Sequence, residues 1–435
     1  MVPKEIMTWL ASIVLLSIYG YFCTRTVRKG ILVFAACLPL YLIKLSVGPI
    51  PTNFLELMFI VLFVVWALGF LQERRRDSLK HLLSSHKRLS LGILLLLLGG
   101  CLGLLQTGDL LSALNVLKSY LVEPLLLGAM IWSVSRSSEN FHLRQFLVAL
   151  SVPVIVLSVF ALFQTFTGLA IPEAWALERR VTGLYPYPNA LGHFVAPIIT
   201  VLAVLFMDDK SRFTTAQRRI LGSAFFLGII SVYLAQTEAA LLAIAVSLFL
   251  VSFLYKKGAA ITVPLLLCFI LTVLIVSPLR TTIVQKITLQ DWSGQTRITQ
   301  WKETGHFLLA SPRHFLLGAG PNNYPAAISP YHTYTHLEIF QYPHNIFLNA
   351  WVEFGVLGLA GFCLIAYSLW KITIRKSNSY YVVAFGAGLA EMVIHGLVDV
   401  PFLKNDLAFL GAVFVVLLLI ASEKEKPFSP KQLLR

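Results

Sequence analysis

Charged residues are scarce in this chain: they make up 13% of its 435 residues, against about 25% in an ordinary soluble domain. Hydrophobic residues make up 57%, and apolar runs long enough to cross about 30 Å of hydrocarbon recur from end to end. Because a bilayer core holds no water to satisfy backbone groups, such runs must be helical. The composition therefore predicts an all-α polytopic integral membrane protein.

Cysteine is also sparse, and acidic residues are outnumbered by basic ones. The five cysteines show neither a CxxC pair nor a Cys/His ligand spacing, so we expect no disulfide framework, no metal and no cofactor. The net charge of +14 falls mainly in every second loop. Cytoplasmic loops are rich in Lys and Arg, so this charge indicates membrane orientation rather than nucleic-acid binding, and it places the C-terminus inside.

The apolar runs predict about 12–13 transmembrane helices in a single membrane domain, residues 1–435. The first run has no charged leader and no small-residue cleavage site, so we expect a span rather than a signal peptide. If it does not cross the membrane, twelve spans remain. The expected spans are 6–23, 31–47, 54–71, 90–106, 110–134, 146–168, 190–207, 220–236, 239–255, 260–278, 344–370, 380–398 and 404–421.

Two longer segments, both predicted to be extracytoplasmic, interrupt the pattern of tight turns. The shorter covers residues 170–189, and the larger covers residues 279–343. A loop of the second kind is usually functional or disordered. Its aromatic residues and the helical pattern over Arg297–Leu309 argue against disorder. We expect a partly helical lid over the membrane.

His344 lies where the larger loop re-enters apolar sequence, directly before Asn345 and shortly before Gly355-x-x-Gly358. An imidazole titrates near neutral pH and accepts a proton from a hydroxyl nucleophile. The alternative is an interfacial polar cap that is hydrogen-bonded to a neighbouring loop. Five of the ten histidines lie between residues 306 and 344, which favours a functional site here.

The two long loops also carry arginine, against the positive-inside tendency. A guanidinium binds phosphate oxygens through two parallel hydrogen bonds, which suits an anionic lipid headgroup. For Arg180 and Arg297 an ion pair, with Glu178 and Glu303 respectively, is an equal alternative. The arginines of these loops are Arg179, Arg180, Arg280, Arg297 and Arg313.

Ionisable residues within or beside the apolar runs form a third group. Lys44, Lys118 and Glu123 lie inside predicted spans, where charge is costly and by default functional. We favour a structural ion pair between Lys118 and Glu123. Glu238 and Asp399 are placed at outer ends of spans, where either acid orients an imidazole or caps a helix.

Several of these segments resemble the O-antigen ligase family, which includes O-antigen-polymerase-like and protein O-oligosaccharyltransferase members. His344-Asn345, nine residues, then Gly355-x-x-Gly358 is similar to the family's signature at the end of its large loop. The stretch from Arg297 to Trp301 resembles the start of that loop, and Arg180-x-Thr182-Gly183 resembles the shorter one. The resemblance covers most of residues 150–400.

The resemblance implies a GT-C-like, inverting membrane glycosyltransferase of polysaccharide biosynthesis in the bacterial inner (cytoplasmic) membrane, active on the extracytoplasmic side. The donor would be an undecaprenyl-pyrophosphate-linked glycan and the acceptor a hydroxyl of a lipid, glycan or protein. His344 would be the catalytic base, and Arg180 and Arg297 would bind the pyrophosphate. Supporting residues would be Asn345, Glu238, Asp399 and Trp301.

One departure and two alternatives accompany this resemblance. Many members carry Ser-Arg-Gly/Ala where this chain reads Thr237-Glu238-Ala239, so a cationic contact to the pyrophosphate is replaced by a carboxylate. A polymerase that joins lipid-linked repeats is a second possible enzyme. A polyisoprenoid-glycan transporter is the alternative outside enzymology, and it predicts a polar path through the spans.

Overall fold

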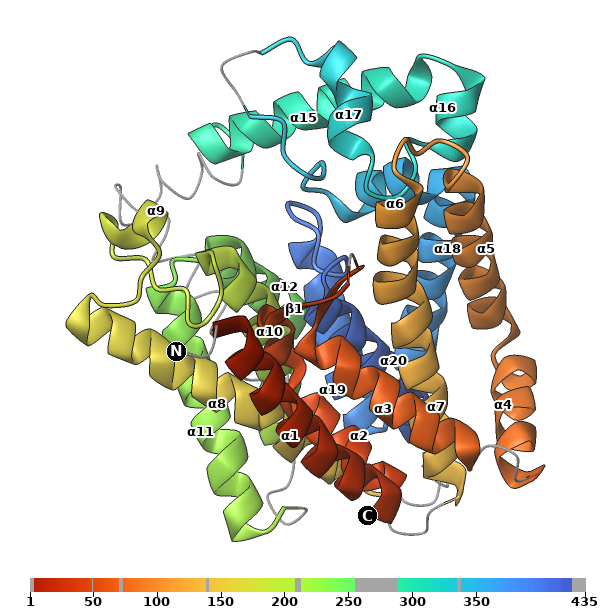
Figure 1. The fold of residues 1–435 in the computed structure, drawn as a ribbon, viewed down its shortest axis with the longest axis vertical. Coiled ribbons are helices and arrows are strands. Elements are labelled where there is room, and N and C mark those ends of the chain that lie inside the picture. The colour runs from red at the N-terminus through yellow and green to blue at the C-terminus, as the bar shows by residue number, and fades with distance from the viewer. Residues whose placement is uncertain are drawn as a thin grey trace.

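The computed structural model describes residues 4–48, 50–69, 73–137, 141–207, 213–254, 288–334 and 338–424. Most of the helices form a bundle, and a smaller helical layer lies across one end of it (Figure 1). The elements are α1 (Lys4–Arg25), α2 (Val27–Ala36), η1 (Leu38–Leu42), β1 (Lys44–Val47), β2 (Ile50–Asn53), α3 (Phe54–Leu68), α4 (Glu73–Ser85), α5 (Lys87–Gly103), α6 (Leu110–Leu117), η2 (Lys118–Val122), α7 (Glu123–Ser137), α8 (Leu143–Thr167), α9 (Glu173–Ala176), α10 (Pro188–Phe206), α11 (Thr215–Leu234), α12 (Glu238–Leu254), α15 (Trp292–Leu309), α16 (Pro312–Leu317), α17 (Tyr324–Ile328), η4 (Ser329–Tyr331), α18 (Ile346–Arg375), α19 (Tyr380–His395) and α20 (Asn405–Lys424).

The all-α polytopic class is confirmed. Among the described residues five helices are long and apolar enough to cross a membrane, and a sixth results if a pair bent by 96° is one span. Three shorter apolar helices, α3, α12 and α19, accompany them. The count of 12–13 spans stays a prediction, because the expected span at 260–278 lies outside the described residues. Arg280 lies outside them as well. The five spanning helices are Leu110–Ser137, Leu143–Thr167, Pro188–Phe206, Ile346–Arg375 and Asn405–Glu423.

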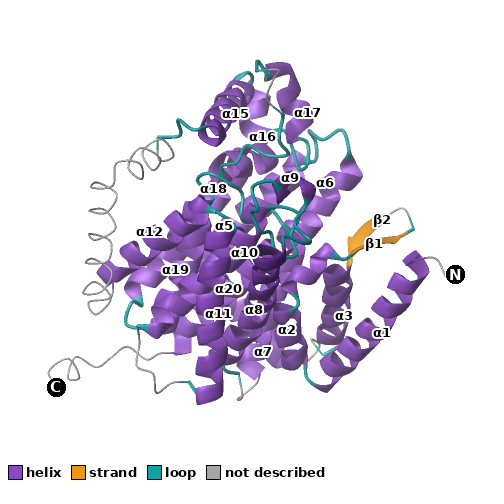
Figure 2. Cartoon of the chain, turned by 90° about the vertical axis from the view of Figure 1, so that its left-hand side faces the viewer, coloured by secondary structure: helices purple, strands orange, loops and turns teal. Residues whose placement is uncertain are grey.

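The span expected at residues 31–47 is wrong. The α2 helix ends at Ala36, the 3₁₀ turn η1 follows with Pro39 near its start, and the chain then enters the antiparallel hairpin β1–β2 (Figure 2). Proline lacks a backbone N–H and its ring clashes with the preceding turn, so it ends an α-helix. As a result Lys44 is exposed in β1, with its Nζ 5.0 Å above the Tyr41 ring.

The ion pair expected between Lys118 and Glu123 is also wrong. Lys118 pairs with Glu56 of α3, while Oε2 of Glu123 has no hydrogen-bond partner among the described residues. The Lys118 side chain reaches across to α3 instead. In the π-turn η2, directly before Glu123-Pro124, the N–H of Glu123 donates to the Lys118 carbonyl, as expected where proline interrupts the hydrogen-bond ladder.

Glycines bring α5 and α18 into close contact. A Cβ atom on Gly99 of α5 would lie 2.3 Å from the carbonyl oxygen of Phe354 in α18, and one on Gly361 would lie 2.6 Å from the carbonyl oxygen of Gly92. Membrane helices associate largely by van der Waals packing, and small residues permit such close approach. The close contact holds the α18 backbone directly against α5, below the helical layer that lies across the end of the bundle.

We call α15, α16 and α17, which form the layer across the end of the bundle, the lid (Figure 1). The lid helices confirm the helical pattern predicted over Arg297–Leu309. The lid docks at a kink in α18, where Gly355 has φ 65° and ψ −174°. The kink leaves the Val352 carbonyl free to accept from the backbone N–H groups of Ala319, at 2.7 Å, and Gly320, at 3.2 Å. The glycine-rich turn after α16 therefore holds the lid.

Candidate functional site

His344 lies in the turn that joins the lid to α18. Its backbone has φ 47°, a left-handed conformation that is uncommon for residues other than glycine and that costs about 1–3 kcal/mol where it occurs. Its Nδ1 lies 3.3 Å from Oε1 of Gln300 in α15. An amide oxygen only accepts, so Nδ1 donates and the neutral ring keeps its lone pair on Nε2.

The neighbours of His344 keep its ring uncharged. The rings of Phe340 and Tyr342 have centroids 4.9 Å and 5.2 Å from it. Burial lowers the pKa of His344; the Asp399 carboxylate acts in the opposite direction, and the cations Arg297 and Lys404 add to the lowering. The lowered pKa favours the neutral imidazole, which is the form that acts as a base.

Trp301 and Asn345 fix the two backbone flanks of His344. Trp301 donates from Nε1 to the carbonyl of Pro343 at 2.9 Å. Asn345 caps α18 by accepting from the N–H groups of Phe347 and Leu348. Its Nδ2 also donates to the Leu397 carbonyl at 3.0 Å. Trp301 and Asn345, two of the four residues predicted as supporting, thus hold the turn that carries the imidazole.

Arg297 reaches the same place from α15. Its Nε donates to the Val398 carbonyl at 2.8 Å and its Nη1 to Ser293 at 2.6 Å. The predicted alternative, an ion pair with Glu303, is wrong. Glu303 binds His332, at 3.1 Å, instead. Within the described part of the chain no acidic group pairs with Arg297, so its charge is directed at the neighbourhood of His344.

Asp399 lies behind His344, in the turn after α19. The Val400 N–H donates to its Oδ1 at 2.8 Å, and Nε2 of His193 lies 2.9 Å from its Oδ2. Burial acts to raise the pKa of Asp399, but His193, Lys404 and His344 together hold it well below the ordinary value. The carboxylate is therefore ionised, and the structure places Asp399 with His344 and Arg297.

Arg180 and Glu238 lie in a neighbouring cluster. Arg180 donates to the carbonyls of Ala235 and Gln236, at 3.3 Å and 3.4 Å, in the turn that joins α11 to α12. Its Nη1 is 3.8 Å from Glu178, as the predicted ion pair requires. Glu238 is the exposed first residue of α12. Among the described residues no hydrogen bond or ion pair joins Arg180 to His344.

Lys404 and His193 belong to the site and were not predicted. The Nζ of Lys404 is buried without a hydrogen-bond partner in the described residues, and it lies 4.7 Å from the Tyr187 ring centroid. Burial acts to lower its pKa, but the phenols of Tyr342 and Tyr187 and the Asp399 carboxylate raise it overall. The sequence did contain a signal for His193, because it is an ionisable side chain within an apolar run, and such residues are by default functional.

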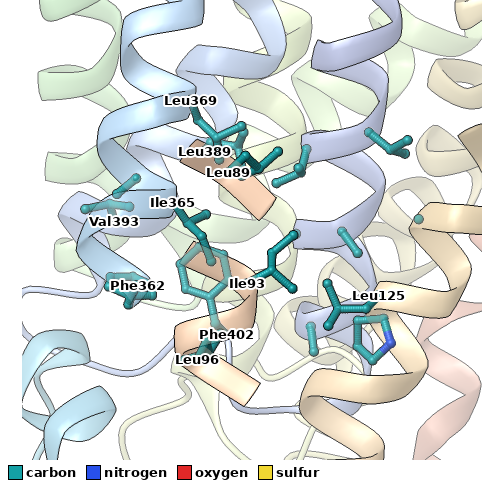
Figure 3. Close-up of a pocket in the computed structure, with 18 of the residues that line it drawn as sticks. Leu89, Ile93, Leu96, Leu125, Phe362, Ile365, Leu369, Leu389, Val393 and Phe402 are labelled. Carbon is teal, nitrogen blue, oxygen red and sulfur yellow. The ribbon is translucent and has the colours of Figure 1, made fainter. Parts of the chain in front are cut away.

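An apolar cavity of about 800 Å³ lies between α5, α7, α18, α19 and α20. Leucine, isoleucine, valine and phenylalanine side chains point into it, among them Ile93 of α5, Phe362 of α18 and Phe402 of the turn before α20 (Figure 3). Its lining includes Ile346, two residues after His344, and Val400, directly after Asp399. The polar site therefore adjoins a compartment that suits a hydrocarbon chain.

The glycine-rich turn after α16 does not form an anion site. The Ala319 and Gly320 N–H groups donate to Val352, and the Asn322 N–H donates to Glu353 at 2.8 Å. These donors are used in docking the lid. Among the described residues no group of three or more His, Cys, Asp or Glu side chains is placed to hold a metal ion.

Residues 223–363 match the family model described as O-antigen ligase. The match begins in α11, includes the lid and His344, and ends in α18 beyond the Gly355 kink. No curated protein matches the chain. The predicted resemblance is thus confirmed over these residues: they are similar to the O-antigen ligase family, and the chain is a largely helical, multi-pass membrane protein.

Proposed function

We propose that this protein transfers a glycan from an undecaprenyl-pyrophosphate carrier to a hydroxyl acceptor, with inversion at the anomeric carbon. The observation that carries the proposal is the state of His344. Its Nδ1 is engaged by Gln300, so that Nε2 is free as a base, and it lies next to the cation Arg297. A base and an anion-binding cation at the mouth of an apolar cavity are the parts that this reaction needs.

In the proposed step His344 Nε2 accepts the proton of the acceptor hydroxyl while its oxygen forms a bond to C1 of the donor sugar. The bond from C1 to the pyrophosphate oxygen breaks, and the electron pair leaves with the pyrophosphate. Arg297 stabilises the charge that develops there. The ionised Asp399 stabilises the imidazolium that forms on His344. Pyrophosphate is a good leaving group, so no general acid is required.

Arg180 is the proposed second contact to the pyrophosphate. It binds the turn at residues 235–238, where family members resembling this chain carry their own arginine and this chain has Glu238. Arg180 thus brings a cation to the turn that lacks one. Gly192, in the first turn of α10, packs against Thr237 of this turn, and the next residue, His193, contacts Asp399.

The cavity fits the lipid part of such a donor. Its lining follows α18 from Ile346 to Thr373, which at 1.5 Å per residue is about 40 Å, enough to cross the hydrocarbon core. The isoprenoid chain would occupy this space and leave the pyrophosphate at the end near His344.

Charge placement supports an extracytoplasmic site in the inner membrane. His344 precedes the first residue of α18, and Arg375 and Lys376 end the helix at the other side. Cytoplasmic ends of membrane helices carry the basic residues. The end with His344 and the lid would therefore face away from the cytoplasm.

The test is glycan transfer in purified membranes with a polyprenyl-pyrophosphate-linked donor. His344→Ala should abolish transfer while donor binding persists, and retained transfer would sink the proposal. Glycolipid profiles of cells without the gene separate the possible enzymes. Accumulated long lipid-linked chains indicate a ligase, and accumulated single repeats indicate a polymerase. A transporter would instead tolerate loss of His344.

A further inference from the structure

Behind Asp399 lies a buried cluster of ionisable side chains that the proposed mechanism does not use. His193 of α10 and His395 of α19 stack with ring centroids 3.9 Å apart. Nδ1 of His395 is 3.3 Å from Oε1 of Glu391. The exposed fractions of His193, His395, Glu391 and Asp399 are 1%, 2%, 0% and 4%. Four groups are thus arranged in order: Glu391, His395, His193 and Asp399.

Such a cluster is costly to bury. A buried polar group without a well-formed hydrogen bond costs about 1–3 kcal/mol, and an ionised one costs more. Both carboxylate oxygens of Glu391, both ring nitrogens of His193 and Nδ1 of His395 have no well-formed hydrogen bond in the described residues. The hydrophobic residues that surround α10 and α19 would fill this space at lower cost. Ionisable groups retained inside a membrane bundle are by default functional.

The contacts of the cluster indicate what it acts on. Oδ1 of Asp399 accepts from the Val400 N–H, and its Oδ2 lies 2.9 Å from Nε2 of His193. One oxygen is therefore fixed by a backbone hydrogen bond, and the other has the His193 ring as its close neighbour. Asp399 interacts electrostatically with His344, the proposed base.

We infer that His193 is a positioning residue for transfer: it donates from Nε2 to Asp399 and holds that carboxylate toward His344, and the stacked His395–Glu391 pair fixes the His193 ring. The inference rests on the proposed function and deepens it. When His344 has taken the acceptor proton, an ionised and fixed Asp399 stabilises the new positive charge. Without the His193 contact, Asp399 turns to Lys404 or takes up a proton, and the stabilisation is lost.

Several charged or titratable groups face this part of the site. Arg297 comes from α15, Lys404 and Asp399 from the turn before α20, and His395 and Glu391 from α19. The phenols of Tyr187 and Tyr342 lie beside Lys404. Arg297 and Lys404 both disfavour a proton on His344, whereas Asp399 and a hydrogen bond with the Tyr342 backbone favour it. Weakening Asp399 therefore makes His344 harder to protonate.

The test compares His193→Phe, which keeps a flat ring for stacking on His395, with His193→Gln, which restores an N–H donor. We expect kcat to fall about 10- to 100-fold in the Phe variant, with the KM for the donor unchanged, as for loss of a hydrogen bond to a charged group. The Gln variant should recover most of the activity. The acidic limb of the pH–rate profile should shift to lower pH in the Phe variant.

A second readout does not depend on turnover. The pKa of His344, followed by NMR on histidine-labelled protein and assigned with His344→Gln, should be lower in His193→Phe than in the wild type. Ser133→Ala, which removes the buried 2.8 Å hydrogen bond from Trp66 between α7 and α3, is the matched control. It should change stability without moving the pH profile.

The outcomes separate this inference from the proposed function. If His344→Ala is inactive but His193→Phe has wild-type kcat and pH profile, the positioning role is overturned and the base remains. A folded Gln variant as slow as the Phe variant also overturns it, because the donor would then not matter. If His344→Ala is active, the proposed function itself fails.

Discussion

Replacement of Gly355 by alanine tests whether the Gly355-x-x-Gly358 part of the signature is structural. Gly355 has φ 65° and ψ −174°, a region that glycine alone adopts readily. A Cβ atom at this position would lie 2.2 Å from the Leu316 carbonyl oxygen and 3.1 Å from the Leu317 Cα. Both are backbone atoms of the lid, so no side-chain rotation relieves the contact.

The expected cost follows from two effects. A residue other than glycine in this conformation is strained by about 1–3 kcal/mol. Moving the lid away to relieve the clash sacrifices the hydrogen bonds from Ala319 and Gly320 to Val352, at about 1 kcal/mol each. The sum of about 3–5 kcal/mol is a large part of the 5–15 kcal/mol that stabilises a typical protein.

The assay is thermal unfolding in detergent together with limited proteolysis of the lid. Gly355→Ala should unfold several degrees below the wild type and should expose residues 312–323 to protease. Gly305→Ala is the matched control, because Gly305 lies inside α15 with open space where its Cβ would go. Alanine there should stabilise the helix by about 1 kcal/mol.

The result that would refute this reasoning is a Gly355→Ala protein with wild-type unfolding temperature and a protected lid. If such a protein were also inactive, the glycine would act in the chemistry and not through the fold.

Three further predictions concern the site itself. Burial lowers the pKa of His344, and only the neutral ring accepts a proton. Activity should therefore rise with pH through a midpoint below the ordinary histidine pKa of about 6.5. A midpoint above about 7 in the pH–rate profile would contradict this. Arg297→Lys should raise the KM for the donor by about tenfold, since lysine lacks the planar fork that binds phosphate. Isothermal titration with inorganic pyrophosphate measures the binding, and equal affinity in both proteins would exclude a contact between Arg297 and the pyrophosphate. Asn345→Ala should lower stability by about 1 kcal/mol through loss of the α18 cap and should slow transfer, which thermal unfolding and turnover together measure; an unchanged unfolding temperature would show that the cap contributes nothing.

The parts of the site that the sequence predicted carry a local signal. Asn345 directly follows His344, Trp301 and Arg297 lie on one predicted helix, and Asp399 is an acid at the predicted end of a span. Apolar periodicity likewise predicted the spanning helices. Where local chemistry and fold agree, reasoning from the sequence succeeds.

The errors arose where the partner is distant in sequence. Lys118 pairs with Glu56 across 62 positions rather than with Glu123 beside it, and Glu303 binds His332 rather than Arg297. His193 was overlooked altogether, although it lies inside a predicted span. The sequence predicted three ionisable residues within spans, but the interior of the bundle contains more of them. The small number of buried ionisable residues is therefore a weaker argument against a transporter.

The sequence by itself determined that this is a helical membrane protein and where the O-antigen ligase-like signature lies, because hydropathy and short motifs are local properties. Only the tertiary structure decided that His344 bonds to Gln300, that Asp399 contacts His193, and that Gly355 kinks α18 where the lid docks. Those contacts depend on how helices pack, and packing is set by all the side chains of the bundle together rather than by any one segment.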